Sequence, residues 1–214
     1  MDKSDESLFP LFLKLSGRSV LLVGGGPVAT SKALSLAEAG ARVIVVSPSM
    51  TPELAELAQA RGWLVTARPF EAADLNGVWL VVAAAPAAVN AQVALAAEAR
   101  RLFVVAVDDP PAASAYGAGI VRRAGITVAI STAGQAPALA GLLREGLDAL
   151  LPAAAAAESW LAEARRLRPV WRAEHVPMAE RRPQLLQALN RLYESRSVPG
   201  EVIREVSPAR VSNG

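Results

Sequence analysis

The sequence contains no cysteine and a single histidine, His175, among its 214 residues. Without cysteine, the chain can form no disulfide, no thiolate metal site and no cysteine nucleophile. A lone histidine next but one to Pro177 is typical of a surface residue, so we predict no preformed metal site of the usual kind. The absence of cysteine suits a reducing compartment, and the cytoplasm is our expectation.

The chain also lacks a strong charge of either sign and a long uninterrupted apolar run. Its 22 basic and 20 acidic side chains give a formal net charge of +2, so nucleic acid is not implied as a partner. The start of the chain is acidic and polar, so we predict no signal peptide. The most apolar stretch, residues 78–97, is interrupted by Pro86, Asn90 and Gln92, which favours a buried strand followed by a helix over a membrane span.

What the chain does have is an alternation of short apolar runs with helical patterns. Such runs, apolar on both faces, belong to a parallel sheet that helices cover on both sides. We therefore predict an α/β fold with an N-terminal Rossmann-type sheet. The expected strands are residues 20–23, 43–46, 64–67, 78–83 and 103–107, and the expected helices are residues 31–39, 54–60 and 89–99.

The character of the sequence changes after Pro111. Two short apolar runs, residues 120–121 and 127–131, flank a tight connection and predict a small separate sheet. From Pro137 onward the pattern is helical, with helices expected at residues 138–151, 153–167 and 178–192. The polar composition beyond Tyr193 is typical of a flexible tail.

A glycine-rich loop follows the first expected strand. Gly24 and Gly26 have no Cβ and allow the backbone to approach a pyrophosphate at a helix N-terminus. Ala29 stands at the third position of the Gly-x-Gly-x-x-Gly/Ala pattern, where a small residue lets helix and strand pack. A glycine turn without a ligand is the alternative. The strand, helix and second strand around the loop favour dinucleotide binding.

The second strand ends without the acidic residue that usually binds the ribose of NAD. Ser47, Pro48 and Ser49 stand there instead. A serine hydroxyl can bind a ribose hydroxyl, but it does not repel a 2′-phosphate. Because no arginine cluster follows Ser47, the residues favour NAD over NADP only modestly.

Several motifs in the same order along residues 8–192 resemble the siroheme synthase N-terminal family. They include the loop Gly24-Gly25-Gly26-Pro27-Val28-Ala29, Asp108-Asp109-Pro110, the stretch from Ser131 to Pro137 and the stretch from Met178 to Arg182. The resemblance implies a dehydrogenase that oxidises precorrin-2 to sirohydrochlorin with NAD⁺, and in several members also inserts ferrous iron. It further implies a homodimer in which the subunits complete each other's sites.

The same resemblance implies a division of the chain and roles for single residues. Residues 1–112 would bind NAD, residues 113–148 would form a dimerisation sheet, residues 149–194 would form a helical domain on the tetrapyrrole side, and residues 195–214 would be a flexible tail. Asp108 would be the catalytic carboxylate, and Thr132 aligns with a serine that is phosphorylated in some members. The NAD contacts would fall on Pro27, Val28, Pro48 and Ser49, beside Gly24, Gly26 and Ser47.

Two departures from the family pattern reduce the polarity expected near the nicotinamide. Ala83-Ala84-Ala85 stands where Ala-Thr-Asp is frequent, and Val105 stands where asparagine is frequent. Two other hypotheses stay open beside the dehydrogenase, the first because of these departures and the second with the helical third as an interaction surface. One is a tetrapyrrole chelatase or carrier without oxidation, and the other is a non-catalytic sensor that binds a dinucleotide.

A set of arginines offers guanidinium groups to the carboxylates of such a substrate. The residues to test first are Arg122, Arg123, Arg144, Arg181 and Arg182. An ordinary salt-bridged helix surface is the alternative for the same residues.

Overall fold

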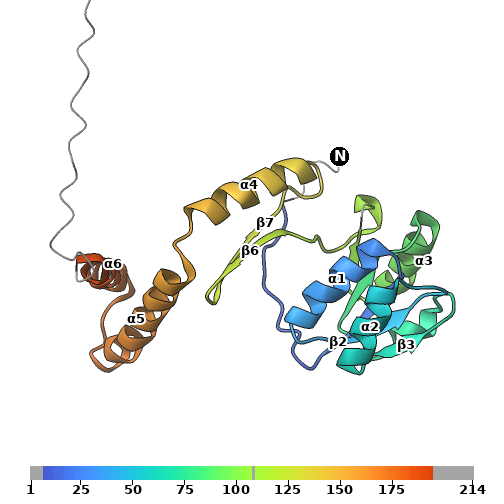
Figure 1. Cartoon of the computed structure of the whole chain (residues 1–214), viewed down its shortest axis with the longest axis horizontal. Helices are drawn as coiled ribbons and strands as arrows, with labels where there is room; N and C mark the ends of the chain where they lie inside the picture. The colour runs from blue at the N-terminus through green and yellow to red at the C-terminus, as the bar shows by residue number, and fades with distance from the viewer. Residues whose placement is uncertain (1–6, 108, 195–214) are drawn as a thin grey trace, which may run out of the picture. The chain divides into compact units, whose positions relative to one another are not determined.

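The structure, a computed structural model, describes residues 7–107 and 109–194. The described residues fall into two compact units, one within residues 7–120 together with 129–145 and the other made of residues 121–128 with 146–194; Figure 1 shows the elements of each. Each unit is described separately below.

The first unit is built on a five-stranded sheet with the strand order β3-β2-β1-β4-β5. All four strand pairs are parallel. The strands are β1 (Ser19–Val23), β2 (Arg42–Val46), β3 (Leu64–Thr66), β4 (Leu80–Ala83) and β5 (Val104–Ala106). This confirms the predicted Rossmann-type α/β fold, although β4 and β5 are shorter than the apolar runs suggested.

Side chains of successive residues in each strand point to opposite faces and build two cores. Val20 and Leu22 join the core beneath helices α1 (Pro27–Glu38) and α2 (Pro52–Arg61). Leu21 and Val23 join the core beneath helix α3 (Ala87–Glu98) and the 3₁₀ helix η2 (Ala72–Leu75). The central strands β1 and β4 are buried on both faces and almost entirely apolar, as expected for a parallel sheet, whereas the edge strand β3 is partly exposed.

Helix ends follow from local chemistry. Proline stands at the first helical turn of both α1 and α2, where its missing N–H costs nothing. Thr51 caps α2 by accepting a hydrogen bond from the N–H of Leu54, and Gly62 ends that helix in the left-handed conformation. Helix α1 begins at Pro27, four residues before the predicted start, so the glycine loop leads directly into it.

Strands β6 (Gly119–Arg123) and β7 (Ile126–Ile130) form the predicted small sheet. Ala124 and Gly125 join them, and both have positive φ, as the tight turns of β-hairpins require. Helix α4 (Pro137–Leu150) follows and is strongly amphipathic, yet none of its residues is buried.

The second unit is dominated by two packed helices, α5 (Ala154–Ala173) and α6 (Met178–Glu194). Helix α5 runs through Pro169, beyond the predicted end at Leu167. Trp171 lies in the following turn, is 8% exposed and donates a hydrogen bond from its Nε1 to Gln184 of α6 at 2.7 Å. The contact between the helices therefore offsets the backbone hydrogen bond that the proline removes.

Among the described residues, no helix combines the length and the apolar character needed to cross a membrane.

Candidate functional site

The glycine loop lies at the carboxyl end of β1, where parallel sheets bind their ligands. Gly24 has a φ of +121°, and a Cβ there would lie 2.2 Å from the carbonyl oxygen of Ala84. The N–H of Gly24 donates to the carbonyl of Val46 at 3.0 Å. Gly24 therefore fixes the loop between the ends of β2 and β4, and no other residue fits there.

Gly25 lies against the segment that follows β2. A Cβ on Gly25 would lie 1.9 Å from the carbonyl oxygen of Ser49. The buried hydroxyl of Ser47 donates to that same carbonyl at 2.6 Å. Ser47 thus shapes the turn rather than presenting its hydroxyl to a ligand, while Pro48 and Ser49 are exposed beside the loop.

Gly26 is the N-cap residue of α1 and has open space where a Cβ would stand. Pro27 occupies the first helical turn, so the N–H groups of Val28 and Ala29 have no partner within the helix. The first turn carries no acidic side chain. A helix N-terminus with free N–H groups and open space fits the pyrophosphate of a dinucleotide.

A pocket of about 220 Å³ lies beside this loop. Its lining comes from α1, the ends of β4 and β5, and α3, and consists of Val28, Ala84, Ala85, Ala87, Asn90, Val107 and Asp109. Asn90 is only 2% exposed, and its Oδ1 accepts a hydrogen bond from the N–H of Ala85 at 3.0 Å. The amide of Asn90 thereby holds the turn after β4 and is one of the polar groups of the pocket.

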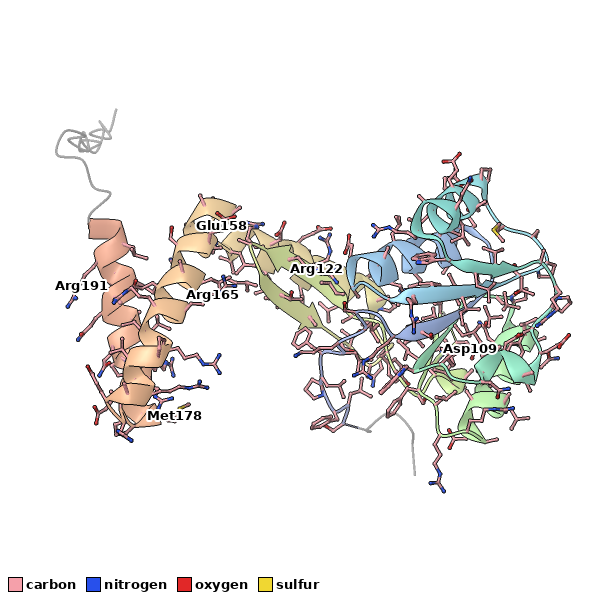
Figure 2. All side chains as sticks on the ribbon, turned by 90° about the horizontal axis from the view of Figure 1, so that it is seen from below. Asp109, Arg122, Glu158, Arg165, Met178 and Arg191 are labelled. Atoms are coloured by element: carbon pink, nitrogen blue, oxygen red, sulfur yellow. The ribbon has the colours of Figure 1, made fainter. Side chains whose placement is uncertain are left out.

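Asp109, labelled in Figure 2, is the carboxylate among the described residues that line this pocket. It precedes the 3₁₀ helix η3 (Pro110–Ala112). The predicted catalytic carboxylate, Asp108, lies outside the described residues, as does the tail from residue 195. Its catalytic role stays a prediction.

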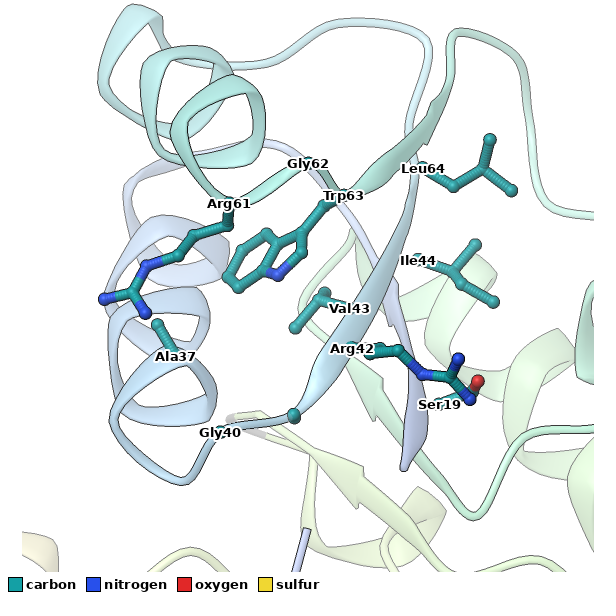
Figure 3. Close-up of a pocket in the computed structure, with 11 residues that line it drawn as sticks. Ser19, Ala37, Gly40, Arg42, Val43, Ile44, Arg61, Gly62, Trp63 and Leu64 are labelled. Atoms are coloured by element: carbon teal, nitrogen blue, oxygen red, sulfur yellow. The ribbon is translucent and has the colours of Figure 1, made fainter. Parts of the chain in front are cut away.

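A larger hollow, of about 470 Å³, opens at the opposite edge of the sheet. Arg42 and Leu64, the first residues of β2 and β3, line this hollow together with Arg61 and Trp63 at the end of α2 (Figure 3). Because Arg42 begins β2 while Ser47 follows it, the Arg42 guanidinium lies at the opposite end of the strand from a cofactor at the glycine loop.

The predicted substrate arginines differ in what they contact. Arg123 donates to the carbonyls of Leu151 and Pro152 and forms an ion pair with Asp148, so it anchors the hairpin to the end of α4. Arg144 pairs with Glu145. The contacts of Arg123 engage both terminal nitrogens of its guanidinium, whereas Arg144 uses one nitrogen and stays partly exposed.

The remaining predicted arginines are Arg122, Arg181 and Arg182. Arg181 donates to the carbonyl of Val176 at 2.9 Å and holds the start of α6. Arg122 lies on β6 and also takes part in an interaction. Within the described residues, Arg182 alone of the five is exposed with no hydrogen bond or ion pair. Their contact with a substrate stays a prediction.

Thr132 lies in the loop before α4. Its Oγ1 accepts a hydrogen bond from the N–H of Ala136 at 3.2 Å, and Ser131 accepts one from Ala133. A Cβ on Gly134 would lie 3.3 Å from the ring of Tyr116, so this loop packs against the segment after η3. The phosphorylation of Thr132 stays a prediction.

No sequence motif marks Asn90, Asp109 or Gly25 as functional on its own. Gly25 was part of the recognised loop, but its contact with Ser49 depends on how the turn after β2 folds back. Asn90 was noted only as an interruption of an apolar stretch. A polar residue in an otherwise apolar helix face was the available signal.

Comparison with known proteins gives the chain a family. The family model described as "Putative NAD(P)-binding" matches residues 11–118, half of the chain. Siroheme synthase 1 of Aeromonas salmonicida (strain A449) is 47% identical over 176 residues, which are 81% of this chain and 37% of that protein. Siroheme synthase 3 of Aeromonas hydrophila subsp. hydrophila is 48% identical over 177 residues, again 81% of this chain and 37% of that protein.

The fold has a solved counterpart in SirC, precorrin-2 dehydrogenase, with a TM-score of 0.65 and 23% identity over 89% of this chain and 93% of that one. The chain spans little more than a third of the length of the siroheme synthases that it matches. The matched region contains the glycine loop, the pocket beside it and Asp109. The chain therefore belongs to the siroheme synthase N-terminal family and carries its NAD(P)-binding domain.

Proposed function

We propose that the protein is an NAD-dependent dehydrogenase that oxidises precorrin-2 to sirohydrochlorin. The observation that carries the proposal is the glycine loop at the N-terminus of α1 with the 220 Å³ pocket beside it. The similarity to siroheme synthases and the fold shared with SirC, precorrin-2 dehydrogenase, support the choice of substrate.

The two halves of the cofactor would bind at different parts of the site. Dinucleotides bind across the point where the strand order reverses, which here lies between β1 and β4. We assign the adenosine half to Pro48 and Ser49 after β2 and the nicotinamide half to the pocket of Val28 and Asn90. When bound, NAD⁺ supplies the acceptor for the hydride.

Removal of the hydride leaves a proton that a base must accept, because each oxidation takes two electrons and releases one proton. We assign this proton to the carboxylate of Asp108, on the resemblance to the family. Asp109, the following residue in the sequence, lines the pocket and is the matched control. We expect Asp108→Asn to lower kcat more than 100-fold and Asp109→Asn to lower it less.

NAD rather than NADP is our proposal for the cofactor. The turn Ser47-Pro48-Ser49 carries no cation for a 2′-phosphate, and the exposed Arg42 lies at the other end of its strand. Titration of NAD⁺ and NADP⁺ by calorimetry should give a lower Kd for NAD⁺. A lower Kd for NADP⁺ would overturn this assignment.

We propose that the protein forms a homodimer through the apolar face of α4. Five leucines spaced at helical intervals along α4 are exposed, namely Leu139, Leu142, Leu143, Leu147 and Leu150. A continuous apolar helix face favours a protein contact. Leu142→Glu with Leu147→Glu should shift the mass in sedimentation from dimer to monomer, whereas the exposed Leu95→Glu on α3 should not.

Under this proposal, residues 1–112 bind the cofactor, residues 113–148 mediate pairing of subunits and residues 149–194 contact the tetrapyrrole. A reduced tetrapyrrole and NAD⁺ meet in the cytoplasm, where we place the reaction.

The test is anaerobic incubation with enzymatically made precorrin-2, with and without NAD⁺ and with and without ferrous ion, followed by absorbance. NAD⁺-dependent formation of sirohydrochlorin is the expected result. Metal insertion into sirohydrochlorin without NAD⁺ would indicate a chelatase instead, and dinucleotide binding without turnover would indicate a sensor. Iron insertion in addition to oxidation would extend the proposal without changing it.

A further inference from the structure

Lys32 lies on α1 one turn beyond Val28, which lines the pocket beside the glycine loop. Residues four apart on a helix share a face, so Lys32 continues the face of α1 that borders this pocket. Its side chain is half-buried. The lysine therefore lies next to the proposed cofactor site.

The ammonium of Lys32 reaches the segment that follows η3. A Cβ built on Gly117 would lie 3.4 Å from the Nζ of Lys32. The φ of Gly117 is outside the left-handed region, so its backbone does not require glycine. The missing side chain leaves the flank of the Lys32 ammonium open.

Tyr116, beside Gly117, connects this place to two other segments. The ring of Tyr116 packs against Gly134 in the loop before α4, and its hydroxyl lies 3.5 Å from the carbonyl of Pro110. Lys32 thus stands where α1, the segment after Asp109 and the loop before α4 converge, all within the first unit.

The charge of Lys32 has no partner in the part of the chain that the structure describes. No hydrogen bond or ion pair engages it. Lysine is scarce in this chain, with three lysines against nineteen arginines. An ammonium offers three donors and binds a carboxylate as a compact charge.

We propose that the Nζ of Lys32 binds a carboxylate arm of the tetrapyrrole and so holds the macrocycle beside the pocket. This inference rests on the proposed function for the identity of the ligand. It adds a substrate-binding residue on the cofactor-binding helix, separate from the arginines predicted from the sequence.

The experiment measures equilibrium binding of sirohydrochlorin, which keeps the carboxylates and needs no turnover. Lys32→Gln should raise the Kd about tenfold, because it removes a charge-assisted hydrogen bond. Lys32→Arg should recover most of the affinity. Lys14→Gln, at an exposed lysine outside the site, is the matched control and should leave the Kd unchanged.

A second pair of variants separates a charge effect from a structural one. Gly117→Asp places a carboxylate beside Nζ that competes with the ligand, whereas Gly117→Asn has the same shape without the charge. We expect Gly117→Asp to raise the Kd about as much as Lys32→Gln, and Gly117→Asn to change it less than threefold. The effects of Gly117→Asp and Lys32→Gln should not add, because both act on one contact.

The same variants are assayed for NAD⁺ binding, which should stay within twofold of the wild type. A tenfold loss of NAD⁺ affinity in Lys32→Gln would assign the lysine to the cofactor phosphates and overturn the inference. An unchanged Kd for sirohydrochlorin would overturn it as well. If the wild type binds sirohydrochlorin through Lys32 but does not oxidise precorrin-2, the proposed function fails and the inference stands.

Discussion

The first unit, called the sheet unit below, and the helix pair α5–α6 differ in how many of their own apolar side chains they bury. The sheet unit contains two cores whose central side chains, such as Leu21 and Leu22, are fully buried. Among the residues of α5 and α6 whose burial the structure describes, Ala157 and Trp171 are the buried ones. The sheet of the first unit is thus covered by its own helices, whereas α5 and α6 leave surface for a large ligand, which matches the tetrapyrrole contact proposed for residues 149–194.

The largest effect should come from the glycine loop that the sheet unit holds in place. Gly25→Ala puts a methyl group 1.9 Å from the carbonyl of Ser49, and we expect it to cost about 3 kcal/mol or more in the free energy of unfolding. Gly26→Ala meets open space and should leave Tm unchanged, yet raise the Kd for NAD⁺ at least tenfold by filling the place of the pyrophosphate.

Denaturant unfolding and calorimetric titration of both variants check this pair. Equal stability of the two variants would show that the conformation of the turn after β2 does not require glycine at position 25. Unchanged NAD⁺ affinity in Gly26→Ala would remove the cofactor from this loop.

The next effect should appear in the helices alone. Trp171→Ala removes the largest buried side chain of α5 and its hydrogen bond to Gln184, and we expect a loss of about 3–5 kcal/mol confined to α5 and α6. Hydrogen exchange should rise in both helices and stay constant in the sheet. Trp171→Phe keeps most of the packing and should lose about 1 kcal/mol. Faster exchange in β1 and β4 would contradict the division into two units.

A smaller effect is expected for Asn90, the polar residue of the pocket. Asn90→Ala leaves the N–H of Ala85 without its acceptor, so we expect a loss of about 1–3 kcal/mol in stability and a weaker affinity for NAD⁺. Gln92→Ala, at an exposed position of the same helix, is the control for helix propensity. Chemical unfolding and NAD⁺ titration of both variants measure the difference, and matching results for the two would refute the role of Asn90.

The smallest effect concerns an ion pair at the rim of the sheet unit. Arg68 donates two hydrogen bonds to Asp74, and these bonds lower the pKa of the Asp74 carboxyl. A carboxyl whose pKa is lowered in the folded state stabilises the fold at pH values above its ordinary pKa of 3.8. This stabilisation is lost as the pH falls through the lowered pKa. Asp74→Asn should therefore lower Tm by roughly 2–4 °C at pH 7.

The difference in Tm between Asp74→Asn and the wild type should shrink as the pH falls below 3.8. Thermal unfolding between pH 7 and pH 2 measures it. A difference that stays constant across this range would show that the ion pair contributes nothing.

The sequence predicted the sheet and the loop because both depend on local patterns. Runs such as Val43 to Val46 are apolar on both faces, and glycines between a strand and the helix that follows form a recognisable local pattern. The course of α5 through Pro169 was missed, because the compensating contact of Trp171 with Gln184 is a tertiary one. The contacts of Arg123 with the end of α4 could not be predicted either, because its partners lie 25 to 29 residues away in the sequence.

The decisive measurement is the ratio of NADH formed to precorrin-2 consumed by the protein under anaerobic conditions. We predict one NADH for each sirohydrochlorin formed by the wild type, and a rate lowered at least tenfold in Gly26→Ala at limiting NAD⁺. Oxidation of precorrin-2 without NADH, or a Gly26→Ala variant as fast as the wild type, would contradict it.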